Sequence, residues 1–106
     1  MFFELRQYRV KDGQRENWVK LMEDKIIPFQ IAQGMVVIGS FVGEQEEDLY
    51  VWIRRFESEE QRVALYEKVY QSDYWQNDIA PLVGDMLYRE RIQVTRLEAT
   101  PKSVIQ

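Results

Sequence analysis

The stretch from Asp48 to Glu57 alternates strictly between two kinds of side chain, and this pattern most limits what the chain can fold into. Successive side chains of a β-strand point to opposite faces, so the stretch predicts a strand with two different faces. One face is aliphatic and the other carries aromatic rings and a cation: Leu49, Val51 and Ile53 against Tyr50, Trp52, Arg54 and Phe56. Neither face is suited to water, so we expect the strand to lie in a sheet that is covered on both sides.

Three other stretches also predict strands. Residues 2–10 and 91–97 alternate in the same way, and residues 35–42 form an apolar, β-branched run that contains Gly39. A glycine inside such a run indicates a bulge or a close approach of another group. We expect the strands at residues 35–42 and 48–57 to form a hairpin.

Two amphipathic helical regions separate these strands. The first covers about residues 14–33, where apolar residues recur every three or four positions; Pro28 predicts a kink or break in it, and Gly34 predicts its end. The second begins at Ser58, which is followed by the spacing of a capping box, and restarts after Ser72. Pro81 marks another break, which a new helical turn would tolerate.

The order strand, helix, strand, strand, helix, strand is typical of the ferredoxin-like βαββαβ fold, an α+β fold with a four-stranded antiparallel sheet in the order 4-1-3-2. Helices cover one face of that sheet. We expect the aliphatic side chains to lie under them: Phe3, Leu5, Val51, Ile53, Ile92 and Val94. The other face would hold the aromatic and polar side chains: Glu4, Arg6, Tyr8, Tyr50, Trp52, Arg54, Gln93 and Thr95. Because so large a patch with exposed aromatic rings seldom stays in water, we expect a homodimer that pairs sheet against sheet.

Composition narrows the possible functions. The 106 residues predict one domain, residues 1–99, with a loose tail at residues 100–106. The net charge of −4 and the absence of a basic run argue against nucleic acid as a partner. The sequence has no cysteine or histidine, which excludes a thiol nucleophile, an imidazole base and the ordinary zinc site; we expect no metal and no cofactor. No apolar run approaches the roughly 20 residues of a membrane span, and no secretory signal is visible, so we predict a cytoplasmic protein.

Three segments together resemble the NIPSNAP family: residues 2–13 with the pattern F-x-E-L-R-x-Y-x-V-x-x-G, residues 50–56 with YVWIRRF, and residues 70–81 with Y-x-S-x-x-W and I-x-P. The resemblance implies a dimeric α+β barrel, in which two ferredoxin-like sheets close around a central cavity. The family's biochemical function is poorly defined. The wider superfamily includes cofactor-free monooxygenases, haem-degrading enzymes, decarboxylases and binding proteins, so this fold does not decide an activity.

The candidate ligand site consists of six side chains on the face predicted to be free of helices: Glu4, Arg6, Tyr8, Tyr50, Trp52 and Arg54. A guanidinium there could bind a carboxylate, enolate or quinone oxygen. Alternatively, one of the arginines forms an internal salt bridge with Glu4 that fixes the strands or the dimer. The aromatic rings could stack on a flat ligand or simply fill the interface.

We therefore expect a small homodimeric protein that binds a small anionic or aromatic ligand in the barrel cavity. The alternative is a cofactor-independent monooxygenase or isomerase that acts on a phenolic or enolisable substrate, in which arginine stabilises an oxyanion and tyrosine transfers the proton. A third interpretation is a structural homodimer with a filled barrel. The sequence does not assign a catalytic residue.

Overall fold

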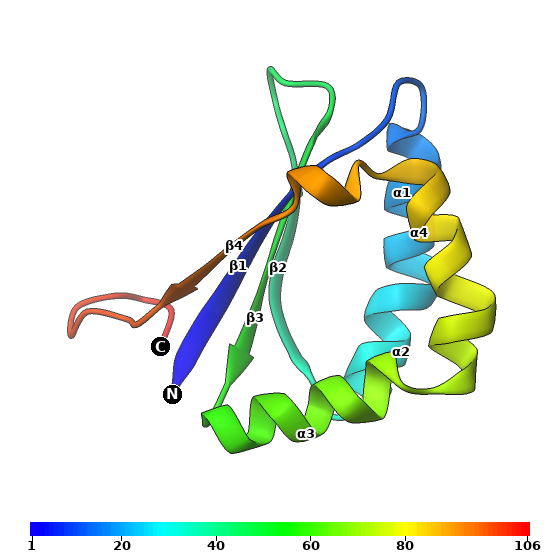
Figure 1. Cartoon of the computed structure of the whole chain (residues 1–106). Helices are drawn as coiled ribbons and strands as arrows, with labels where there is room; N and C mark the ends of the chain where they lie inside the picture. Colours follow the sequence, from blue (N-terminus) through cyan, green and yellow to red (C-terminus); the bar gives the residue numbers. More distant parts are fainter.

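The computed structural model describes all 106 residues, which form one four-stranded antiparallel sheet with the helices on one side (Figure 1). The strands are β1 (Phe2–Arg9), β2 (Val36–Val42), β3 (Leu49–Phe56) and β4 (Gln93–Leu97). They lie in the order β2-β3-β1-β4. The predicted ferredoxin-like topology and strand order are therefore confirmed.

Two helical segments connect the strands. The first consists of α1 (Arg15–Leu21), the π-helical turn η1 (Met22–Ile26) and α2 (Ile27–Ala32). The second consists of α3 (Glu59–Tyr70), the π-helical turn η2 (Tyr74–Ile79) and α4 (Ala80–Met86), and the short 3₁₀ turn η3 (Arg89–Arg91) leads into β4. None of these helices combines the length and the apolar character needed to span a bilayer. The predicted cytoplasmic location is not tested by this finding and stays a prediction.

Each proline in the helices is separated from the preceding π turn by one residue. The N–H of Ile27 donates to the carbonyl of Met22, and the N–H of Ala80 donates to that of Trp75, five residues back in both cases. Pro28 and Pro81 then lie in the first turn of α2 and α4, where the missing N–H is tolerated. At Pro28 we predicted a kink or a break. The structure has a widened helical turn just before the proline, and the backbone continues as a helix.

The predicted helix end at Gly34, the bulge at Gly39 and the helix cap at Ser58 are confirmed. Gly34 ends the first helical segment with φ of 110°, a conformation that favours glycine. The register of β2 against β3 shifts between Val37 and Gly39, as a bulge requires. The Oγ of Ser58 accepts a hydrogen bond from the backbone N–H of Gln61 at 3.1 Å, which caps α3.

The predicted faces of β1 and β3 are wrong. Every second residue of β3 is buried under the helices, and these are the aromatic and cationic ones: Tyr50, Trp52, Arg54 and Phe56. Directly paired residues of neighbouring antiparallel strands share a face, and Glu4 pairs with Arg54, Arg6 with Trp52, and Tyr8 with Tyr50. The aliphatic residues expected under the helices lie on the open face instead: Phe3, Leu5, Val51 and Ile53. The predicted faces of β4 are correct. Val94 pairs with Arg6 and therefore lies on the helix side, and Thr95 pairs with Leu5 and therefore lies on the open face.

The faces were predicted wrongly because the partners of the buried charge on Arg54 come from other segments of the chain. The prediction treated a strand face with an arginine as too polar for the core. Residues of the helical segments supply hydrogen-bond partners for Arg54, so the charge is tolerated under the helices. Aromatic side chains each bury roughly 150–250 Å², more than the aliphatic ones, so burying them favours this orientation.

The core lies between the sheet and the helices and has two parts. The larger part surrounds Tyr8, Trp18 and Trp52, and the smaller one joins Phe2, Met35, Phe56 and Val69 at one end of the sheet. On the opposite side of the sheet the chain from Thr100 folds back beside β1 and β3 (Figure 1), and Ile105 lies with Phe3 and Ile53 around a hollow of about 320 Å³. The tail boundary at residue 99 stays a prediction.

Candidate functional site

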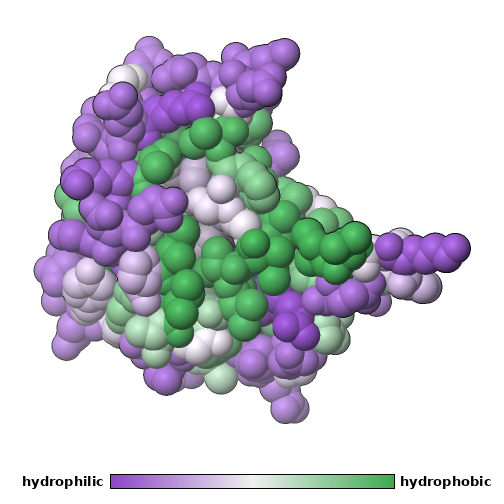
Figure 2. Space-filling view, turned by 180° about the vertical axis from the view of Figure 1, so that it is seen from behind, coloured by the Kyte–Doolittle hydropathy of each residue, from purple (hydrophilic) through white to green (hydrophobic).

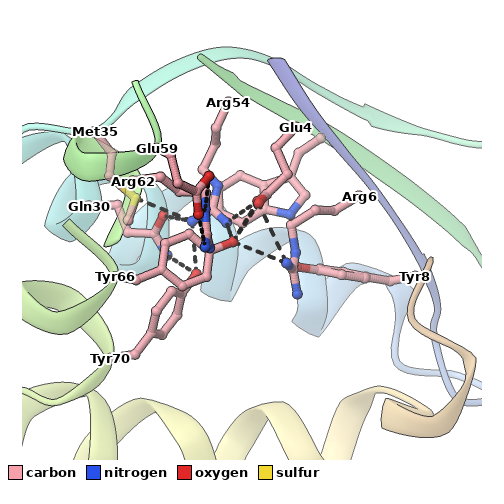
Figure 3. Close-up of polar contacts among 11 residues, drawn as sticks. Glu4, Arg6, Tyr8, Gln30, Met35, Arg54, Glu59, Arg62, Tyr66 and Tyr70 are labelled. Carbon is pink, nitrogen blue, oxygen red and sulfur yellow. Dashed lines mark hydrogen bonds and ion pairs between the residues drawn. The ribbon is translucent and has the colours of Figure 1, made fainter. Parts of the chain in front are cut away.

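Arg54 is the centre of a buried polar network that joins the sheet to both helical segments (Figure 3). Its side chain is 0% exposed, and Nη2 donates to Glu4 Oε1 at 2.6 Å and to the Tyr66 hydroxyl at 2.8 Å. The other terminal nitrogen, Nη1, donates to Gln30 Oε1 and to the Tyr70 hydroxyl, both at 2.8 Å. The internal salt bridge considered from the sequence is therefore present.

The network keeps its charges in place. Burial acts to raise the pKa of Glu4, but the charge of Arg54 and hydrogen bonds from Tyr66 and Arg54 outweigh it, so the pKa is lowered. Burial raises the pKa of Tyr66, whose hydroxyl donates to both carboxylate oxygens of Glu4 at 2.7 Å. At neutral pH the network thus contains an ionised Glu4, a neutral Tyr66 and a charged Arg54.

A cavity of about 300 Å³ lies beside this network, between the sheet and the helices. Four polar side chains line it, Arg6 and Tyr8 from β1, Tyr70 from the end of α3 and Arg89 from η3. The rest of the lining is apolar and includes Trp18, Met22, Ile26, Trp75, Leu87 and Ile92. An apolar cavity with a few polar groups is typical of a small-molecule site.

Arg6 connects the network to the cavity. In Figure 3 its guanidinium lies between Tyr8 and the pair formed by Glu4 and Tyr66. Nε donates to the Tyr8 hydroxyl at 2.7 Å, and Nη1 lies 3.4 Å from the Tyr66 hydroxyl and 3.6 Å from Glu4 Oε1. No protein acceptor is within hydrogen-bond distance of Nη2. The side chain is 18% exposed, so Arg6 is shielded yet reachable from the cavity.

Of the six predicted site residues, Arg6 and Tyr8 line this cavity. Glu4 and Arg54 lie in the adjoining network, and Tyr50 and Trp52 pack in the core, where Trp52 Nε1 donates to the Tyr8 hydroxyl at 2.9 Å. All six are close together, as predicted, but on the helix side of the sheet. Ligand binding by any of them stays a prediction.

Some residues that line the cavity cannot be distinguished from packing residues in the sequence. Trp18 and Met22 fit an apolar helix stripe, and nothing in the pattern separated that role from lining a cavity. Trp75 belongs to η2, and Met22 and Ile26 to η1, so both π turns contribute to the lining. A π turn often occurs at a functional site, and a proline within a helical pattern was the available signal. No signal in the sequence singled out Arg89.

A four-stranded antiparallel sheet with helices on one face and a cavity beneath them defines a ferredoxin-like α+β protein. The model of the NIPSNAP family matches residues 3–101, and the chain belongs to this family. None of the curated proteins matches the sequence.

Solved structures of bacterial proteins share the fold. A NIPSNAP family protein from Agrobacterium tumefaciens is 22% identical, with a TM-score of 0.87 over 99% of this chain and 98% of that one. An uncharacterized NIPSNAP domain protein from Burkholderia xenovorans is 20% identical, with a TM-score of 0.83 over 97% and 98%. A putative antibiotic biosynthesis monooxygenase from Nitrosomonas europaea is 11% identical, with a TM-score of 0.69 over 93% and 98%. At these identities the similarity shows the fold and leaves the function open.

Proposed function

We propose that the protein binds a small organic anion in the cavity between the sheet and the helices, with Arg6 as the contact for the negative charge. The observation that carries this proposal is an uncompensated charge. Glu4 is the single carboxylate near two guanidiniums, and it lies 2.6 Å from Arg54 but 3.6 Å from Arg6. The two arginines share this one carboxylate, so together they keep a net positive charge, and Arg6, the arginine farther from Glu4, faces the cavity.

The charges on the side chains that line the cavity also favour a bound anion. None of the lining side chains carries a carboxylate, and Arg89 adds a second cation. A hydrogen bond from a guanidinium to an anion is roughly twice as strong as one between neutral groups, and low solvent access strengthens it. The aromatic rings of Trp18, Tyr8 and Trp75 offer surface for a flat apolar body.

Calorimetric titration with phenylacetate tests the proposal, with the neutral 2-phenylethanol as the matched ligand. We expect phenylacetate to bind and the alcohol to bind at least tenfold more weakly, because the alcohol lacks the charge. Arg6→Met should remove this preference while the fold is kept. Equal affinity of the variant and the unmodified protein for phenylacetate would contradict the role of Arg6.

The alternative function, a cofactor-independent monooxygenase or isomerase, has weaker support. Isomerisation requires a base, and no lining side chain is a carboxylate or an imidazole. Burial raises the pKa of Tyr8, which makes its phenol a poor base at neutral pH. Oxygen consumption in the presence of hydroquinone, abolished by Arg6→Met, would select the monooxygenase instead of the binding protein.

We also propose a homodimer formed through the open face of the sheet. The hollow with an apolar rim that is visible in Figure 2 lies between the helices and the sheet, so it is separate from the open face. On the open face of the sheet Phe41 is 54% exposed and Leu97 41%, and Leu5, Val51 and Ile53 are partly exposed. A patch of this kind supports a self-complementary contact. The surface is the aliphatic face and not the aromatic face that the sequence suggested.

Sedimentation equilibrium at low micromolar concentration tests the dimer. We expect two chains for the unmodified protein and one chain for Val51→Lys, because the substitution places a charge in the centre of the open face. Val63→Lys, on the exposed surface of α3, is the matched control and should stay dimeric. A monomer for the unmodified protein would exclude the proposed contact.

A further inference from the structure

We propose that the cavity prefers carboxylates with a second oxygen acceptor next to the carboxyl group, with 2-oxo carboxylates as the ligand class, and that Tyr8 and Tyr70 donate the hydrogen bonds that make this distinction. The inference rests on the anion binding proposed above. Its starting point is the direction of the hydrogen bonds around the cavity.

Tyr8 has a proton to donate and no protein acceptor for it. A phenol oxygen accepts two hydrogen bonds and donates one. The Tyr8 oxygen accepts from Arg6 Nε at 2.7 Å and from Trp52 Nε1 at 2.9 Å, which uses both acceptor positions. Burial raises the pKa of Tyr8, so the hydroxyl keeps its proton at neutral pH. Because Tyr8 lines the cavity, a bound ligand is the available acceptor.

Tyr70 repeats this arrangement on another wall. Its oxygen accepts from Arg54 Nη1 at 2.8 Å and from Gln30 Nε2 at 3.3 Å, and its own proton has no protein acceptor. Tyr70 also lines the cavity. Two tyrosines, one on β1 and one at the end of α3, thus line the same cavity, and each has a hydroxyl proton without a protein acceptor.

In the same network the hydroxyl of Tyr66 has protein partners both as a donor and as an acceptor. It accepts from Arg54 and Arg6 and donates its proton to Glu4. It is not part of the cavity lining. The spare protons are therefore a property of the two tyrosines that line the cavity and not of the network as a whole.

A third spare donor belongs to Trp18, whose ring centroid lies 5.8 Å from that of Tyr8. The indole Nε1 of Trp18, in α1, is buried without a hydrogen-bond partner, and Trp18 lines the cavity. Side-chain donors therefore come from β1, α1 and the end of α3, while no lining side chain is a carboxylate, an amide or an imidazole. We expect a single carboxylate bound at Arg6 to leave some of these donors without an acceptor. A ligand with a second oxygen satisfies more of them, and each buried donor left unsatisfied costs binding free energy.

The test compares phenylacetate with benzoylformate by calorimetric titration. The two share the ring and the carboxylate; benzoylformate adds the 2-oxo oxygen and has no hydrogen to enolise, so binding is measured without turnover. We expect benzoylformate to bind the unmodified protein about tenfold more tightly, because its 2-oxo oxygen accepts neutral hydrogen bonds from two hydroxyls and each contributes a few fold. Tyr8→Phe and Tyr70→Phe should each reduce this preference by several fold.

Tyr50→Phe is the matched control, because Tyr50 is a buried tyrosine on the same face whose hydroxyl bonds to Ser40 outside the cavity. It should keep the full preference. Near-ultraviolet circular dichroism confirms that each variant is folded, and Trp18→Phe provides a further variant that removes a donor from another element. Equal affinity of both ligands for the unmodified protein overturns this inference and leaves anion binding intact. If neither ligand binds, the proposed function fails and this inference fails with it.

Discussion

The two faces of β3 differ in what the rest of the chain offers them. On the helix side Arg54 receives partners from β1 and from both helical segments, and it is fully buried among aromatic rings, with the ring of Trp52 4.6 Å away. On the open side Val51 and Ile53 meet no helix and stay partly exposed. The comparison teaches that the burial of a charged residue depends on partners supplied by distant segments more than on the polarity of its own strand face.

The largest effect is expected from removing the buried charge. Arg54→Met leaves Glu4 buried without its main cation and removes the donors to Gln30 and Tyr70. We expect the free energy of unfolding to fall by about 3–5 kcal/mol, which is typical when one partner of a buried ion pair is lost. Urea unfolding of the two proteins measures the difference.

Arg55→Met is the matched control on the open face. Arg55 is the next residue of the same strand, and its Nη2 lies 3.4 Å from Glu57 in a partly exposed ion pair. We expect a change of less than about 1 kcal/mol, because exposed pairs contribute little. If both substitutions changed the stability by the same amount, the difference between the two faces would have no energetic basis.

A smaller effect is expected from titrating the network. The pKa of Glu4 in the folded protein lies below its ordinary value of 4.5, so the stabilisation from its charged form is fully present above that value. It is lost as the pH falls through the lowered pKa. Unfolding measurements between about pH 6 and about pH 3 should therefore show decreasing stability, and Glu4→Gln should flatten this dependence.

Glu59 provides the control for this titration. Hydrogen bonds from Arg62 lower its pKa to about 2, but the carboxylate is exposed on α3. Glu59→Gln should leave most of the acid dependence unchanged. An unchanged acid dependence in Glu4→Gln would instead assign the loss of stability to exposed carboxylates.

The smallest effect is expected from a neutral hydrogen bond on the helix side. Tyr50 and Ser40 share a hydrogen bond between their hydroxyls across β2 and β3. Tyr50→Phe should lower the free energy of unfolding by about 1 kcal/mol, the net value of a neutral hydrogen bond. A double-mutant cycle with Ser40→Ala measures the coupling; a coupling as large as the effect of Arg54→Met would show that charge is not what distinguishes the network.

The topology was predictable because it follows from local signals. Alternation located β1, β3 and β4, and an apolar β-branched run located β2. Ser58 and Gly34 marked helix ends, and the order of elements left one common fold. The face assignment of β1 and β3 was not predictable in this way, because it depends on contacts such as that between Tyr66 and Glu4, 62 residues apart. A sequence pattern shows that two faces differ and does not show where their partners lie.

The candidate site could be predicted in part. Arg6 and Tyr8 were identified from their shared strand face, and both line the cavity. Tyr70 and Trp75 belong to the pattern at residues 70–81 that resembles the family, but that pattern does not separate lining residues from packing residues. Their contribution depends on how the second helical segment lies over the sheet, which a single sequence does not specify.

The two π turns have a consequence for the mobility of the cavity wall. Such a turn is a defect in the helix, and in a uniform helix it can migrate when one hydrogen bond is exchanged for the next. After each of these turns, with one residue between, the chain has a proline, Pro28 or Pro81, which has no N–H to exchange. We therefore expect that the defect cannot move toward the C-terminus. Met22, Ile26 and Trp75 would then keep a fixed helical phase, and the cavity would keep its shape even though irregular helix forms part of its wall.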